Sequence, residues 1–98
     1  MTIRLPKIIN YGQYSGDNYG AHTLKVDMGT FDLYYSYETI VAYSDYKEGL
    51  ICSQNQWGTT TGKHLNWIEP NKKLRKSAEE FDRMLEEMLK RNLVQQIQ

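Results

Sequence analysis

The sequence has little of the chemistry that most directly reveals a function. Its 98 residues include one cysteine, Cys52, and two histidines, and its formal charges sum to zero. One cysteine cannot form an intrachain disulfide, and one cysteine with two histidines falls short of the four ligands that a structural zinc site normally takes. Cys52 lies among strand-like apolar residues and is interpreted as a small buried side chain. We therefore expect no disulfide, no metal and no cofactor.

Long apolar runs are also absent. No stretch approaches the roughly 20 apolar residues of a membrane span, and the N-terminus lacks the continuous apolar stretch and small-residue cleavage site of a secretory signal. The sequence therefore predicts a soluble, intracellular protein that does not bind membranes. With 98 residues, the chain is long enough for one domain and too short for two.

A net charge of one sign is missing as well, because twelve basic and twelve acidic residues cancel. No global field favours non-specific association with nucleic acid or membranes, so nucleic acid is a disfavoured partner. One local cluster is basic and consists of Lys72, Lys73, Arg75 and Lys76. It could contact phosphate, but the favoured interpretation is a solvated linker before a helix with an acidic first turn.

Residues 1–56 have the pattern of β-structure. β-branched and aromatic residues recur there with period two, and clusters of Gly or Asp interrupt them. The expected strands cover residues 3–11 with a break at Pro6, and then residues 21–28, 31–35, 35–43 and 50–56. Residues 12–20 are expected to form a loop. Since the other connections are short, the pattern predicts an antiparallel meander of about five strands.

Beyond Pro70 the periodicity becomes that of a helix. Ser77 is a credible N-cap, and Glu80 three residues later completes a capping box. The apolar residues that follow lie on one helical face: Phe81, Met84, Leu85, Met88 and Leu89. We expect this face to pack on the domain's own sheet, in preference to a coiled coil or a groove in another protein.

The predicted fold is therefore a single α+β domain. An antiparallel sheet of about five strands over residues 1–56 packs against a C-terminal amphipathic helix over residues 77–95. Between them, residues 57–70 carry a polar motif with a short helical turn near 60–68. Leu93, Val94 and Ile97 extend the apolar character towards the C-terminus, which either a frayed tail or a homodimer contact would explain.

The polar motif is the strongest indication of a binding surface. Its stretch from Gly58 to Lys63 is similar to a phosphate-binding P-loop, but three residues instead of four separate the glycines, and His64 stands where Ser or Thr should follow the lysine. We therefore do not predict nucleotide hydrolysis. Two interpretations remain open. The amides, threonines, Lys63 and His64 form a cradle for a phosphate or carboxylate, or the Thr and Asn side chains cap a helical turn through residues 65–68.

No set of residues indicates catalysis. A nucleophilic mechanism would need Cys52 or a serine beside His64 and an acid, and the carboxylates are spread over separate turns and strands. We predict no enzymatic activity and no catalytic residue.

Tyrosine, in contrast, is abundant, with eight residues. Tyrosine is typical of recognition surfaces because it offers a large contact area with a polar tip. The tyrosines of the expected strands are interpreted as structural. Tyr11, Tyr14 and Tyr19, in or beside the glycine-rich loop, are better candidates for contacts with a partner.

Several segments together resemble a family of small uncharacterised proteins of tailed bacteriophages and prophages. These segments are residues 19–24, 35–42 and 57–66 and the Glu80-Phe81 pair of the helix, and the most specific part is the motif W-G-T-T-T-G-K-H-L-N at 57–66. The resemblance implies a phage origin and a location in the cytoplasm of the infected host cell. It implies no activity, so no catalytic residue can be transferred.

The leading hypothesis is a non-enzymatic phage accessory protein that binds a host protein or protein complex, such as a component of a CRISPR or other defence system. The alternative is a small-ligand binder that sequesters a nucleotide-like or phosphate-bearing signal. The candidate binding residues for both are Tyr14, Tyr19, His22, Trp57, Thr59, Thr60, Thr61, Lys63, His64 and Asn66.

Overall fold

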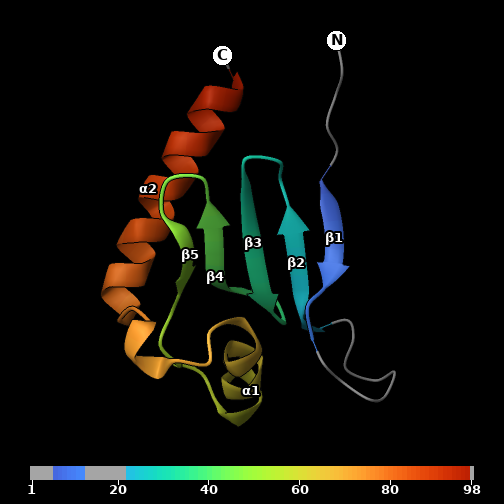
Figure 1. Ribbon diagram of the computed structural model, residues 1–98, viewed down its shortest axis with the longest axis vertical. Helices are drawn as coiled ribbons and strands as arrows, with labels where there is room; N and C mark the ends of the chain where they lie inside the picture. Colours follow the sequence, from blue (N-terminus) through green and yellow to red (C-terminus); the bar gives the residue numbers. More distant parts are fainter. Residues whose placement is uncertain (1–5, 13–21, 98) are drawn as a thin grey trace.

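The computed structural model describes the backbone of residues 6–12 and 22–97, and the side chains of that part as far as Leu93. It has five strands, two α-helices and a short 3-10 helix, and forms an α+β fold (Figure 1). The elements are β1 (Lys7–Asn10), β2 (Leu24–Asp27), β3 (Phe31–Ser36), β4 (Thr39–Asp45), β5 (Gly49–Cys52), α1 (Thr59–Ile68), η2 (Lys72–Leu74) and α2 (Ala78–Ile97). No helix in this described part is long and apolar enough to span a membrane.

The five strands form one antiparallel sheet in the order β1-β2-β3-β4-β5, so the predicted meander is confirmed. Gly29, with φ of 100°, lies in the turn between β2 and β3, and Gly49, with φ of 72°, begins β5. Both backbones are left-handed, which glycine adopts without a steric penalty. β5 ends at Cys52, earlier than expected, because the polar residues after Ser53 turn towards α1.

Each face of the sheet carries an apolar cluster with its own helix. On one face, Phe31, Leu33 and Tyr43 pack with Phe81 and Met88 of α2. This contact confirms the predicted packing of the C-terminal helix.

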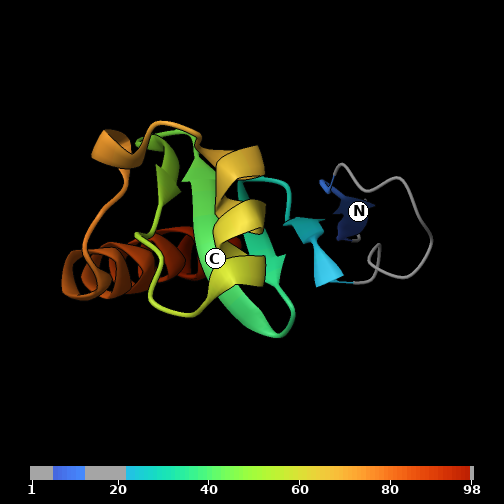
Figure 2. The same ribbon diagram turned by 90° about the horizontal axis from the view of Figure 1, so that it is seen from below.

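On the other face, Val41, Ala42 and Cys52 pack with Leu65 of α1. Figure 2 shows the two helices on opposite sides of the strands. The short turn expected near residues 60–68 is thus a ten-residue helix that closes the second face.

The start of α2 also follows the prediction. The Ser77 hydroxyl accepts a hydrogen bond from the backbone N–H of Glu80 at 3.4 Å, and Glu79 and Glu80 place negative charge in the first turn. Further along, Arg91 donates to Asp45 at 2.5 Å and to Glu48 at 3.0 Å, at the turn between β4 and β5. Capping and this ion pair together fix the position of α2 along the sheet.

Asp45 is held as a carboxylate in this turn. Burial alone would raise its pKa, but hydrogen bonds from the Arg91 guanidinium, the backbone N–H of Glu48 and the Asn92 amide outweigh burial and lower it. Asn92 adds a second anchor, because its amide donates to Asp45 at 3.2 Å and to the carbonyl of Met88 at 2.9 Å.

The connection between the two helices is fastened to the end of β5. Ser53 and Lys76 form an isolated parallel bridge, in which the N–H of Lys76 donates to the carbonyl of Cys52 at 2.8 Å. The N–H of Gln54 donates in turn to the carbonyl of Lys76 at 2.7 Å. These bonds bring the basic cluster at residues 72–76 next to residues 54 and 55, beside α1.

Candidate functional site

Most of the polar motif is helix α1, and a side chain ahead of the helix shapes its start. The side-chain oxygen Oδ1 of Asn55 accepts a hydrogen bond from the backbone N–H of Trp57 at 2.9 Å, and its Nδ2 donates to the backbone carbonyl of Gly58 at 3.0 Å. A Cβ on Gly62 would lie 3.0 Å from the Asn55 amide nitrogen, so glycine makes room for this side chain.

The N-cap of α1 is Gly58, and no side chain caps it. The expectation that Thr and Asn side chains cap a turn at 65–68 is therefore wrong, because the helix begins six residues earlier, at Thr59.

Two of the predicted binding residues face inward. Thr61 and His64 are buried, and the hydroxyl of Ser36 on β3 lies 2.9 Å from Thr61 Oγ1 and 2.6 Å from His64 Nδ1. Helix periodicity places residues 61, 64 and 65 on the face that packs against the sheet. The prediction that Thr61 and His64 present donors to a partner is thereby corrected, since their hydrogen bonds tie α1 to β3.

The Ser36–His64 pair has the separation that nucleophilic catalysis requires, but its surroundings favour a structural role. Ser36 is buried, and its oxygen contacts Thr61 as well as His64. Burial, and to a smaller extent the charge of His22, lowers the pKa of His64, so the imidazole is held neutral. A neutral, inaccessible imidazole stabilises the contact between helix and strand.

Two aromatic rings lie close to the His64 imidazole, that of Trp67 stacked on it and that of Tyr37 tilted. The His64 ring centroid lies 5.6 Å from that of Trp67 and 5.8 Å from that of Tyr37, and Tyr37 in turn lies 4.4 Å from His22. Tyr37 has a left-handed backbone, with φ of 57°. With Glu38 and Thr39, Tyr37 and His22 line a cavity of about 500 Å³. From the sequence, Tyr37 is expected to be an ordinary strand residue, because no pattern marks a tyrosine with positive φ.

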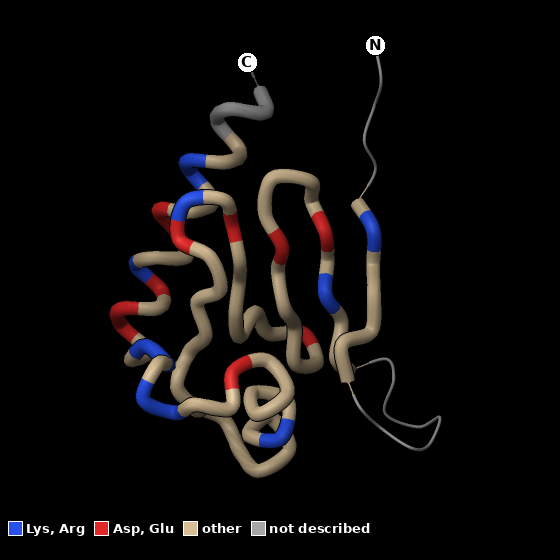
Figure 3. The backbone as a smooth tube through the Cα atoms, in the orientation of Figure 1, with Lys and Arg blue, Asp and Glu red and all other residues tan. Residues whose placement is uncertain are grey.

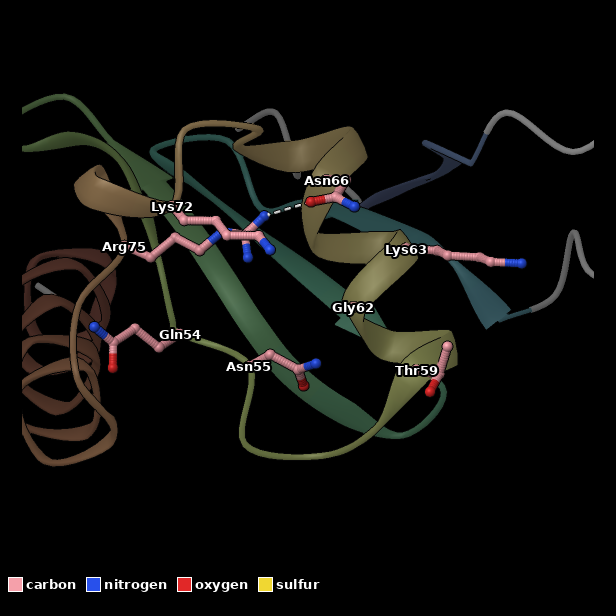
Figure 4. A pocket seen from close by; sticks show the side chains of 8 residues that line it. All are labelled: Gln54, Asn55, Thr59, Gly62, Lys63, Asn66, Lys72 and Arg75. Carbon is pink, nitrogen blue, oxygen red and sulfur yellow. Dashed lines mark hydrogen bonds between the residues drawn. The ribbon is translucent and has the colours of Figure 1, made fainter.

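A separate polar pocket of about 480 Å³ lies between α1, the segment before it and the connection after it (Figure 4). Its lining residues come from three stretches of chain: Gln54, Asn55, Thr59, Gly62, Lys63, Asn66, Lys72 and Arg75. Three of these side chains are cationic and none is acidic. Figure 3 shows the basic residues on α1 and on the connection between the two helices.

Arg75 is the most constrained cation of the pocket, with only 7% of its surface exposed. Its Nε donates to the carbonyl of Glu69 at 3.0 Å, and its Nη2 donates to the same carbonyl at 2.9 Å. Its Nη2 also donates to Asn66 Oδ1 at 2.8 Å (Figure 4). These bonds use three of the five guanidinium protons. Within the described residues, the two Nη1 protons have no partner and no carboxylate forms an ion pair with Arg75.

The predicted binding residues therefore divide into groups. Thr59, Lys63 and Asn66 line the pocket, although Figure 4 shows the Lys63 side chain extending outward from α1, away from Arg75. Trp57 and Thr60 are exposed beside the pocket without lining it, and His22 lies at the other cavity. Tyr14 and Tyr19 lie outside the described residues.

Five of the residues that line the pocket are not among the candidates predicted from the sequence: Gln54, Asn55, Gly62, Lys72 and Arg75. Lys72 and Arg75 were recognised as basic but assigned to a solvated linker. Burial is what distinguishes Arg75 from the other basic residues of the connection. This burial follows from the bridge between Ser53 and Lys76, which the sequence does not reveal.

The residues described supply no evident metal site or reactive thiol. No group of three or more His, Cys, Asp or Glu side chains that could hold a metal ion occurs in this part of the chain. Burial raises the pKa of the Cys52 thiol to about 11, so the thiol stays protonated at neutral pH.

Comparison with known protein families gives a match over most of the chain. A family model described as "Family of unknown function (DUF8033)" matches residues 9–83. No curated protein and no solved structure matches the chain. The matched stretch contains every residue that lines the polar pocket.

Proposed function

Since the chain belongs to the family of unknown function DUF8033, which brings no activity with it, we propose from the geometry that this protein binds a small phosphate-bearing ligand in the pocket beside α1. The proposed role is non-enzymatic sequestration of such a ligand. The observation that carries the proposal is the buried Arg75 guanidinium at the pocket wall.

A buried cation without a carboxylate partner is unusual. Removing a charge from water is costly unless an opposite charge compensates, and a buried arginine is therefore normally paired. At Arg75 the carbonyl of Glu69 and the amide oxygen of Asn66 orient the guanidinium but leave its charge uncompensated. An anion in the pocket would accept the remaining Nη1 protons and supply the missing charge.

The rest of the lining favours phosphate over a singly charged carboxylate. Lys72 adds a second positive charge, and Lys63 adds a third at the edge of the pocket, where its side chain extends outward from α1. No acidic side chain lines the pocket. The start of α1 adds backbone N–H groups that no side chain caps, and these also attract anions. A volume of about 480 Å³ is within the range of small-molecule sites.

Binding is favoured over catalysis by the same lining. Its side chains are cations, amides and one hydroxyl, and none of them is a histidine, a cysteine or a carboxylate. A general base near neutral pH is therefore missing from the pocket wall. The one buried base nearby on α1, His64, faces the sheet.

Thermal shift with a panel of phosphates tests this proposal. Inorganic phosphate, a sugar phosphate and a nucleoside monophosphate are compared with acetate. A true ligand at 100 times its Kd is expected to raise the Tm by about 10 °C, because it binds only the folded state. Lys72→Ala should weaken binding about fivefold, as expected for one partly exposed ion pair.

Lys73→Ala is the matched control. Lys73 is the exposed neighbour of Lys72 but does not line the pocket, so its removal changes the net charge equally. The pocket would not be the binding site if no phosphate raised the Tm, or if Lys72→Ala and Lys73→Ala lost equal amounts of binding affinity.

A second candidate function is binding of a host macromolecule, in the setting that the resemblance to phage proteins implies. One observation favours it: Trp57 is 40% exposed and belongs to a run of exposed residues that continues through Thr59 and Thr60. Exposed tryptophan is enriched among the residues that dominate protein interfaces. The partner would be a host protein complex such as a CRISPR or other defence component.

Affinity purification from host lysate tests this candidate. A stoichiometric partner should be recovered with the unchanged chain and lost with Trp57→Ala. Leu74→Ala serves as the control, since Leu74 is a more exposed apolar residue outside the motif. A partner retained equally by both variants would exclude the Trp57 surface.

A further inference from the structure

The outward side of α2 has an apolar stripe. Leu85, Leu89 and Leu93 line a hollow of about 400 Å³, and the remaining lining residues are Asp82, Glu86 and Lys90. Leu85 and Leu89 are half-buried against the core, whereas Leu93 is 40% exposed. All six residues belong to α2, so no other described element covers this hollow.

The stripe is continuous along the helix. Positions 82, 85, 86, 89, 90 and 93 follow the spacing of one helical face over three turns, or about 16 Å. It is a separate face from the one on which Phe81 and Met88 meet the sheet. An apolar face of this length could be covered by one further helix that packs alongside α2.

The charges at the edge of the hollow determine the direction of that helix. Asp82 and Glu86 lie towards the N-terminal end of the stripe, and Lys90 lies towards the C-terminal end. A second copy of α2 in parallel would place Glu86 opposite Glu86 and Lys90 opposite Lys90. Within one helix, Glu86 and Lys90 form an i,i+4 ion pair at 3.1 Å. In the antiparallel direction, with the two-fold axis near Met88, each Glu86 also faces the Lys90 of the other copy, and the antiparallel helix dipoles attract each other.

We propose that this face of α2 binds a second copy of the chain in an antiparallel two-fold dimer. The leucines of the two copies interdigitate, and the contact between Glu86 and Lys90 occurs twice. Zero net charge adds no global repulsion between copies. Three turns of helix bury less than the roughly 1,600 Å² of a standard interface, so a dissociation constant of about 10–100 µM is expected.

Sedimentation equilibrium of the full chain from 5 to about 500 µM tests the dimer, because these concentrations bracket the expected dissociation constant. The average mass should rise from 11.5 kDa towards twice that value. Glu86→Lys and Lys90→Glu should each weaken the dimer about tenfold, because each reverses two symmetric contacts. The combined variant should restore the original dissociation constant.

The helix itself supplies the control. Arg83 and Glu87 form an ion pair of the same i,i+4 spacing at 3.4 Å on α2 but do not line the hollow. Glu87→Lys should therefore leave the dissociation constant unchanged, and circular dichroism checks that every variant is folded. A chain that stays monomeric throughout, or a combined variant as weak as the single ones, would overturn the proposal.

Discussion

Replacing Arg91 with alanine is expected to lower the free energy of unfolding by about 3–5 kcal/mol, the range measured when one partner of a buried ion pair is removed. The Asp45 side chain is fully buried, and that of Arg91 is 19% exposed. Without Arg91, Asp45 keeps the Asn92 amide and two backbone N–H groups but loses its compensating charge. Urea denaturation at pH 7 measures the change.

The prediction has a matched control on the same helix. Arg83→Ala removes an exposed ion pair with Glu87 and should change the stability by less than about 0.5 kcal/mol. If Arg91→Ala proved equally mild, the ion pair would not be what positions α2.

The lowered pKa of Asp45 makes the free energy of unfolding depend on pH in the acid range. The unfolded state takes up a proton on this carboxyl below about pH 4, whereas the folded state does so only at lower pH. The contribution of Asp45 to stability is therefore present above pH 4 and is lost as the pH falls further. In Arg91→Ala this part of the acid dependence should shrink.

Replacing Arg75 with glutamine is expected to weaken binding of the phosphate ligand about 10- to 100-fold. Hydrogen bonds from a charged donor contribute roughly 1.5–3 kcal/mol each, and glutamine removes both the charge and the fork of donors. Isothermal titration with the ligand identified by thermal shift measures the change. Arg75→Lys should give an intermediate loss, because it keeps the charge without the bidentate geometry.

Arg75 also supports the fold, because it holds the C-terminal end of α1 through the carbonyl of Glu69. Binding should therefore be measured well below the Tm of each variant. Full affinity in folded Arg75→Gln would refute a ligand site at the guanidinium, whereas weaker folding alone would not.

The strands and α2 could be predicted because their signals are local. Alternating apolar residues mark β2, β3 and β4, and Ser77 with Glu80 marks the start of α2. The length of α1 could not be predicted, since threonines and an internal Gly62 are poor helix formers. That helix depends on contacts from elsewhere, namely the Asn55 side chain at its start and Ser36 on β3.

The candidate site was harder to predict for the same reason. The polar motif drew attention to Lys63 and Asn66, which do line the pocket. The inward direction of His64 depends on helical phase, and the burial of Arg75 depends on a bridge between segments 23 residues apart in sequence, Ser53 and Lys76. Neither can be derived from composition or spacing.

The order of the strands has a consequence for how the chain folds. Each strand pairs with the one before it, and β2 to β5 are joined by connections of only two or three residues. Such pairings close small loops and form rapidly, whereas the contact between Arg91 and Asp45 spans 46 residues. The sheet is therefore expected to assemble first and α2 to dock late, so that loss of Arg91 accelerates unfolding more than it slows folding.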